Sequence, residues 1–241
     1  MRATSGSARV FGLDPWTDTV AIHSRIAYVP GDVSLWPNLT GGEVIDLLCR
    51  MRGTQPTRKA ELIERFDFDP TKKGRTYSKG NRQKVAIIAA FAADADFYVL
   101  DEPTSGLDPL MERQFQDALR DAMGRGATAL LSSHILSEVE KVCDRISIIR
   151  DGQIVDSGTM AQLRHLTRTS IHASVDGDPA PITTLTGVHD LQVDGSRVSF
   201  DVDDVDLPAV LPELARLGVT SLTSQPPSLE DIFMRHYDRS A

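Results

Sequence analysis

Two adjacent carboxylates, Asp101 and Glu102, follow a run of four apolar residues, Phe97 to Leu100. A short aromatic and β-branched run of this kind predicts a buried strand. Ligands of open parallel α/β sheets bind at the carboxyl ends of the strands, so we expect both acids to face a site. Phosphate chemistry would use both, because one carboxylate can hold Mg²⁺ through its water shell while the next deprotonates the attacking water. The alternative is an ordinary strand-to-turn exit at Pro103.

A candidate anion site lies upstream of these acids. Ser78, Lys79, Gly80 and Asn81 immediately precede a predicted helix over residues 82–93. The free N–H groups and the positive end of a helix dipole attract anions, so this segment predicts a phosphate contact.

A histidine supplies the third chemical group. His134 follows Ser132-Ser133 at the end of the apolar run 127–131, which predicts another buried strand. Its position after that strand predicts that it reaches the same sheet edge as Glu102. A lone histidine near a strand end is more often a surface residue, and its place in this series argues against that alternative.

These stretches, in order, resemble the motifs of ATP-binding cassette (ABC) ATPases. Residues 77–84 resemble the signature, 97–102 the Walker B strand, 105–108 the D-loop, and 132–134 the switch-histidine segment. The resemblance implies an α/β fold with a P-loop NTPase-like sheet and a helical subdomain at about residues 40–95. It also implies two subunits that sandwich two ATP molecules, with Mg²⁺, and that drive a separate transmembrane permease.

The resemblance assigns a role to each motif residue. Glu102 would be the general base, Asp101 the acid on the Mg²⁺ side, His134 the γ-phosphate contact, Asp108 the contact across the dimer, and Ser78 with Lys79, Gly80 and Asn81 the signature clamp on the partner's nucleotide. Lys79 stands where the family more often has glycine, and it is either a cation near phosphate or a solvated side chain. Gly31 occupies the position of the family's Q-loop glutamine, and we assign it no role.

One family motif does not occur in the sequence. No Gly-x-x-x-x-Gly-Lys-Ser/Thr string, the phosphate-binding Walker A loop, is present. Thr4-Ser5-Gly6 resembles the turn that follows the Walker A helix, so the resemblance implies that this loop lies upstream of Met1. We therefore expect the chain alone to be unstable and to bind ATP poorly. An inactive remnant or regulatory module is the alternative function.

Local patterns predict the remaining elements of the body. Apolar runs predict strands over 7–12 and 25–30, a Thr40-x-x-Glu43 capping box predicts a helix to about Arg52, and further helices are expected over 57–66 and 110–123. Asp151-Gly152 predicts a hairpin over 145–156, and Thr159-x-x-Gln162 predicts a last capped helix.

The pattern changes after this body, so we expect two domains, residues 1–167 and 168–241. Short alternating strands over 171–175, 191–193, 198–202 and 219–222, a helix over 207–217, a loop over 177–187 and a capped helix over 228–237 predict a small α+β module. Pro227 to Phe233 resembles the carboxyl-terminal extension of drug-exporter-type ABC ATPases. The tail from Arg168 has 5 basic and 12 acidic residues, or −7 of the total charge of −8.

Composition excludes several classes of protein. The uncharged run over residues 85–93 is too short to span a membrane, and the amino terminus lacks a signal-peptide pattern. The resemblance to ABC ATPases implies a peripheral protein at the cytoplasmic face of the membrane. The basic cluster around Tyr77 lacks interleaved aromatic residues, which argues against nucleic acid as a partner. A non-transport ABC ATPase that acts on DNA or ribosomes is a further alternative. Such proteins usually have a second cassette in tandem or a long coiled-coil insertion, and this sequence shows neither. Cys49 and Cys143 predict free core thiols.

Overall fold

The computed structural model describes residues 3–164, 168–203, 205–226, 228–230 and 232. The chain divides into two compact units, Met1–His134 and Ile135–Ala241. The domain boundary expected at 167/168 remains a prediction.

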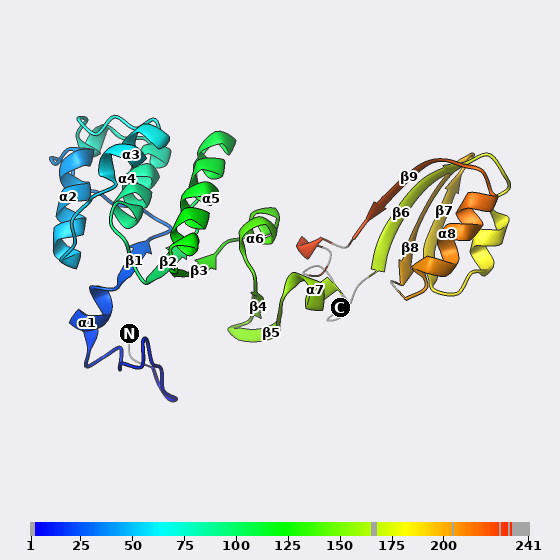
Figure 1. Cartoon of the computed structure of the whole chain (residues 1–241), viewed down its shortest axis with the longest axis horizontal. Helices are drawn as coiled ribbons and strands as arrows, with labels where there is room; N and C mark the ends of the chain where they lie inside the picture. The colour runs from blue at the N-terminus through cyan, green and yellow to red at the C-terminus, as the bar shows by residue number, and fades with distance from the viewer. Residues whose placement is uncertain (1–2, 165–167, 204, 227, 231, 233–241) are drawn as a thin grey trace. The chain divides into compact units, whose positions relative to one another are not determined.

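A parallel sheet organises the first unit. Its strands are β1 (Ile26–Val29), β2 (Phe97–Asp101) and β3 (Thr128–Ser132), in the order β1-β2-β3 (Figure 1). Both pairings are parallel, and Asp101 lies opposite Ser132 in the register. The predicted acids and the serine-histidine segment therefore leave the sheet at the same edge.

One face of this sheet packs against helix α4 (Lys79–Phe91), which is buried along most of its length. The Phe91 ring stacks on Tyr98 of β2 with 4.7 Å between centroids, and it also meets the ring of Phe115 in helix α5 (Pro109–Gly124) edge to face. This aromatic cluster joins α4, α5 and β2 into one core, which fixes the signature helix relative to the Walker B-like strand.

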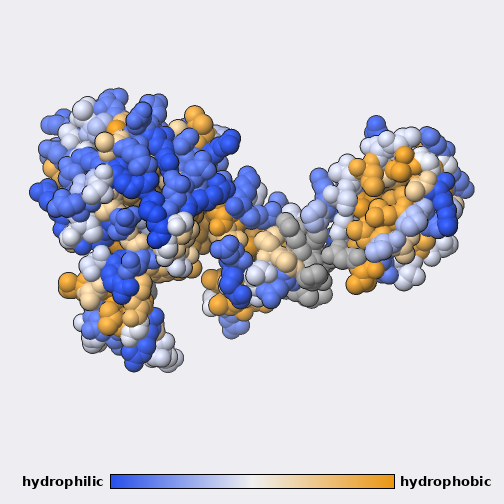
Figure 2. Space-filling view, in the orientation of Figure 1, coloured by the Kyte–Doolittle hydropathy of each residue, from blue (hydrophilic) through white to orange (hydrophobic). Residues whose placement is uncertain are grey.

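The opposite face of the sheet is open. Tyr28 and Leu130 are 57% and 60% exposed, and Val99 lies between them in the register. The prediction that β3 is buried is therefore wrong, because the described helices of the first unit cover only one of its faces. Figure 2 shows hydrophilic side chains over the helices and apolar side chains near the strands of this unit.

Five more helical elements complete the first unit. They are α1 (Thr19–His23), α2 (Gly41–Arg52), α3 (Lys59–Arg65), the 3₁₀-helix η1 (Gly74–Thr76) and α5 (Pro109–Gly124). The Thr40 capping box is present, with Glu43 Oε2 accepting the Thr40 N–H at 2.7 Å. The strand predicted over 7–12 is wrong: only a bridge between Val10 and Leu13 forms, because Phe11 and Gly12 turn the chain at positive φ.

The second unit begins with helix α6 (Leu136–Val142) and the predicted hairpin. Strands β4 (Ile146–Arg150) and β5 (Gln153–Gly158) pair antiparallel, and Asp151 and Gly152 both have positive φ, as a tight hairpin turn requires. Helix α7 (Met160–Arg164) follows, with Thr159 and Gln162 exchanging the predicted capping hydrogen bonds.

A four-stranded antiparallel sheet follows in the order β7-β8-β6-β9. Its elements are β6 (Arg168–Val175), the 3₁₀-helix η2 (Ala180–Thr184), β7 (Val188–Asp194), β8 (Arg197–Asp203), α8 (Leu207–Arg216) and β9 (Val219–Gln225). This order is the ferredoxin-like βαββαβ arrangement with its first helix shortened to η2, so the loop predicted over 177–187 is interrupted by a 3₁₀-helix at Ala180–Thr184. The helix predicted over 228–237 lies largely outside the described residues.

The ferredoxin-like sheet has a core of its own. Ile171, Phe200 and Val202 face Val210 and Leu214 of α8, and all five are at least 98% buried. Alternate residues of the strands point to the other, open face of the sheet.

Two general findings concern thiols and membranes. Burial raises the pKa of both thiols, Cys49 and Cys143, although Cys143 is only partly buried. Within the described part of the chain, no helix combines the length and apolar character needed to cross a bilayer.

Candidate functional site

Glu102 and His134 meet at the carboxyl edge of the first sheet. His134 Nδ1 lies 2.7 Å from Glu102 Oε2, a hydrogen-bonding distance. The side chain of His134 is 73% exposed and that of Glu102 is 31% exposed, so the pair is open to solvent on the histidine side. A carboxylate held by one oxygen keeps its other oxygen available to a water molecule.

The backbone of Glu102 explains how its side chain leaves the sheet. Glu102 has a φ of +45°, which is uncommon for a residue with a Cβ atom. Its N–H donates to Ser132 O at 3.0 Å, and its carbonyl accepts from the Ser105 N–H at 3.1 Å. These hydrogen bonds hold the chain in the turn that aims the carboxylate at the edge.

Asp101 is held separately from Glu102. Ser132 Oγ donates to Asp101 Oδ1 at 2.6 Å across the β2–β3 pair. A Cβ atom at Gly31 would lie 3.3 Å from Asp101 Oδ2, so the chain following β1 passes close to this carboxylate. The hydrogen bond from Ser132 therefore fixes Oδ1 of Asp101, whereas Oδ2 lies next to Gly31, which has no side chain.

The Asp101 carboxylate could supply only part of the coordination shell of a magnesium ion. Within the described residues, no group of three His, Cys, Asp or Glu side chains could hold a metal ion. Mg²⁺ prefers oxygen ligands, keeps several of its waters and commonly uses one or two carboxylates together with substrate phosphates. The Asp101 carboxylate beside Ser132 fits that mode of binding.

The signature-like residues form a second group, around the turn that follows Glu102. Lys79 Nζ donates to Ser105 Oγ at 2.8 Å, so Lys79 has a partner in this turn. A Cβ atom at Gly80 would lie 2.5 Å from Gly106 O, too close for any side chain. The buried Gln83 donates to Pro103 O at 3.0 Å. The start of α4 is thus fastened to the D-loop-like segment.

Helix α4 begins earlier than predicted. Ser78 is its N-cap, and the Ser78 hydroxyl accepts from the Asn81 N–H at 3.3 Å. Lys79, Gly80 and Asn81 therefore form the first turn of the helix instead of a preceding loop. The N–H groups of this turn lack helical acceptors and include the donors that would meet an anion.

Asp108 has a local role in this structure. It is the N-cap of α5, and its Oδ1 accepts from the N–H groups of Leu110 and Met111, both at 3.0 Å. Its predicted contact across a dimer remains a prediction.

Two residues of the site were missed by sequence reasoning. Ser132 and Gln83 were both part of recognised motifs, but neither was assigned a role. The pairing of Asp101 with Ser132 depends on strand register, which neighbouring residues alone do not specify. For Gln83 a signal exists, because a polar residue on a largely apolar helix requires a buried hydrogen-bond partner.

Two family models match the chain. Residues 1–105 match the family described as ABC transporter, and residues 158–237 match the C-terminal domain of the ATP-binding protein DrrA1-3-like family.

Curated relatives extend this similarity. The chain is 36% identical over 147 residues to the uncharacterized ABC transporter ATP-binding protein YthP of Bacillus subtilis (strain 168). The aligned region covers 58% of this chain and 62% of YthP. It is 34% identical over 170 residues to the daunorubicin/doxorubicin resistance ATP-binding protein DrrA of Streptomyces peucetius, covering 68% of this chain and 52% of DrrA. It is 30% identical over 250 residues to the daunorubicin resistance ATP-binding protein DrrA3 of Streptomyces coeruleorubidus, covering 97% and 79%. The chain thus spans less than two thirds of YthP and of DrrA.

A solved structure supports the same fold. The structure described as the ATP binding subunit of an ABC transporter aligns with a TM-score of 0.63 and 28% identity, covering 68% of this chain and 70% of that one.

Proposed function

Because the chain belongs to the ATP-binding proteins of ABC transporters, we propose that it is a nucleotide-binding subunit that couples ATP hydrolysis to export by a membrane partner. Members of this family bind ATP. The names of the relatives DrrA and DrrA3 support a drug-exporter-type role, since both are drug-resistance proteins. The observation that carries the proposal is the 2.7 Å contact between His134 and Glu102 at the carboxyl edge of β2 and β3.

Glu102 acts as the general base in this proposal. When bound, Mg²⁺-ATP supplies the phosphoanhydride and the charge neutralisation that phosphoryl transfer requires. The free oxygen of Glu102 accepts the proton of the attacking water. His134 keeps the carboxylate in place by donating through Nδ1, and in its doubly protonated form it also donates through Nε2 to a phosphate oxygen.

Asp101 acts on the metal side. The hydrogen bond from Ser132 restricts the Asp101 carboxylate to one orientation, with Oδ2 directed toward the chain at Gly31. That orientation lets Asp101 accept from metal-bound water without competing with Glu102.

The start of α4 serves a second subunit. Ser78, Gly80 and Asn81 present the first turn of a 13-residue helix, which attracts the phosphates bound by the partner. Lys79 and Gln83 tie that turn to residues 103–105, next to Glu102. A movement of the signature helix on closing over nucleotide is therefore transmitted to the neighbourhood of the base.

The proposed partners are a second ATPase subunit and a transmembrane permease, with the chain attached at the cytoplasmic face of the membrane. Leu35, Trp36 and Leu39 lie in a loop suited to meet the permease. Trp36 is 47% exposed, whereas the other two are partly buried. An exposed aromatic side chain of this kind is a typical interface anchor.

The test is Mg²⁺-dependent ATP hydrolysis by the chain assembled with its permease and partner subunit. We expect His134→Ala to lower kcat by about 10²-fold or more, because it removes both the phosphate donor and the group that holds the base. His172→Ala is the matched control, since His172 is an exposed histidine of the ferredoxin-like sheet. Undiminished hydrolysis by the His134→Ala assembly would remove the proposed role of the pair.

A further inference from the structure

The two edges of the ferredoxin-like sheet differ. Edge strand β7 carries His189, Asp190 and Asp194. Asp190 has a φ of +53°, and the pairing with β8 shifts between His189 and Gln192, which marks a bulge. Charges and bulges on an edge strand disfavour pairing with another chain, so β7 is a protected edge.

Edge strand β9 carries neither charges nor a residue at positive φ, and its one irregularity, a shift in the pairing with β6 between Ser174 and Val175, lies at its first residues. Its seven residues, Val-Thr-Ser-Leu-Thr-Ser-Gln, include no charge and no proline. Among the described residues, β9 pairs only with β6, and every residue from Thr220 to Gln225 is exposed. A strand of this length with an unprotected edge is a template for another strand.

Leu222 adds a second observation. In the register with β6 it lies opposite Ala173, whose side chain is buried on the α8 side of the sheet. Leu222 is nevertheless 45% exposed, because it stands at the end of that apolar layer. A strand added beside β9 would place a further side chain against it.

We propose that β9 pairs antiparallel with β9 of a second copy of the chain, about a two-fold axis at Leu222. This register joins the two four-stranded sheets into one continuous eight-stranded sheet. In the regular part of β9, from Ser221 onward, the cross-strand pairs are Leu222 with its counterpart and Ser221 with Thr223. Each pair occurs twice, except the central one, as a two-fold interface requires.

The sequence of β9 suits a second copy of itself. The register leaves no charge opposite a charge, sets Leu222 on Leu222, and places hydroxyl groups opposite one another, which are favourable cross-strand pairs. The residues from Arg168 onward carry a net charge of −7, so two such modules repel each other. A neutral strand is the part of the module that can approach a copy of itself with the least repulsion. Added salt should therefore strengthen this dimer, because it screens the surrounding acids.

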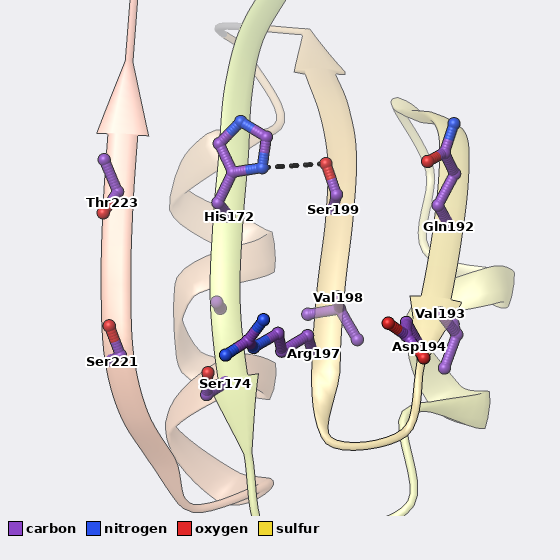
Figure 3. A pocket seen from close by; sticks show the side chains of 11 residues that line it. His172, Ser174, Gln192, Val193, Asp194, Arg197, Val198, Ser199, Ser221 and Thr223 are labelled. Atoms are coloured by element: carbon purple, nitrogen blue, oxygen red, sulfur yellow. Dashed lines mark hydrogen bonds between the residues drawn. The ribbon is translucent and has the colours of Figure 1, made fainter.

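The geometry of the open face allows a sharp test. Ser221 and Thr223 lie on the same face as Ser174 and His172, respectively, above an open concavity of about 440 Å³ (Figure 3). Both side chains point away from the core under α8. Substitutions at these two positions therefore change the edge without disturbing the packed side of the sheet.

The experiment measures the mass of the full chain by sedimentation equilibrium without nucleotide, so that a nucleotide-dependent sandwich does not contribute. Wild type should be a dimer. Ser221→Lys with Thr223→Lys places lysine opposite lysine twice and should weaken the dimer roughly tenfold or more. Ser221→Lys with Thr223→Glu places lysine opposite glutamate at the same positions and should restore it. Gln192→Lys on β7 is the matched control and should leave the dimer intact.

Three results would overturn the proposal. A wild-type chain that stays monomeric leaves the β9 edge to a different occupant, such as an extended segment of another protein. Equal dimerisation of the double-lysine and wild-type chains places the interface elsewhere. Failure of the lysine-glutamate variant to recover, with an unchanged circular dichroism spectrum, rules out the register centred on Leu222.

Discussion

Single atoms decide the geometry around Glu102. Gly80 is the clearest case, because its missing Cβ atom is required by the approach of Gly106 O and not only by a nucleotide. The family resemblance places this glycine in the signature clamp on the partner's nucleotide. In this structure, the residue also lets the signature helix contact the turn after the base.

We predict that Gly80→Ala lowers the free energy of unfolding by about 1–3 kcal/mol, because the new methyl group meets backbone that must shift. Gly124→Ala is the matched control: Gly124 ends α5, has open space around its Cβ position, and should become slightly more stable by about 0.5–1 kcal/mol. Urea denaturation followed by circular dichroism measures both. Equal effects of the two substitutions would contradict the packing argument.

At the scale of elements, local signals predicted most helix starts and strand ends. The capping residues Thr40 and Thr159 act as their motifs indicate, since a cap depends on residues three positions apart. The burial of β3 was not predictable in the same way, because it depends on which elements cover the strand. The sequence predicted that Glu102 and His134 lie near one another, because each residue follows a strand that ends at the same edge of the sheet. The contact of Asp101 with Ser132 could not be predicted in this way, because it depends on the register in which β2 pairs with β3.

The capping box of α2 gives a prediction about pH. Hydrogen bonds from the backbone and side chain of Thr40 hold the pKa of Glu43 below its ordinary value of 4.5. A carboxyl group whose pKa is lowered by folding stabilises the protein above its unfolded pKa, and this contribution is lost as the pH falls through the folded pKa. We expect Glu43→Gln to reduce stability at pH 7 and to have little effect at pH values well below 4.5. Acid titration of the melting temperature tests this, and a Glu43→Gln effect that does not depend on pH would contradict it.

At the scale of the molecule, the chain contains two cores. The first is built on Phe91, Tyr98 and Phe115, and the second on Phe200 with α8. The change in strand pattern near residue 168 predicted a separate α+β module. Its ferredoxin-like strand order was not predictable from the pattern, because alternation identifies strands without specifying their neighbours.

The two cores should unfold separately. Both tryptophans, Trp16 and Trp36, lie in the first unit, so tryptophan fluorescence reports on that unit alone. We expect Phe200→Ala to destabilise the second unit by about 3–5 kcal/mol, because it leaves a cavity in a small core. The fluorescence transition in urea should not move, whereas part of the circular dichroism transition should shift to lower urea. A common shift of both signals would show a single cooperative unit.

The central claim is that Glu102 deprotonates the water that attacks ATP, with His134 beside it. Its most direct test is single-turnover cleavage of Mg²⁺-ATP by the assembled transporter carrying Glu102→Gln, with Glu64→Gln on the exposed face of α3 as the control. The amide keeps the size of the side chain but cannot accept the proton. We expect the Glu102→Gln assembly to bind ATP as the wild type does and to cleave it about 10²–10⁴-fold more slowly, with the control unchanged. Cleavage by Glu102→Gln at the wild-type rate would contradict the account.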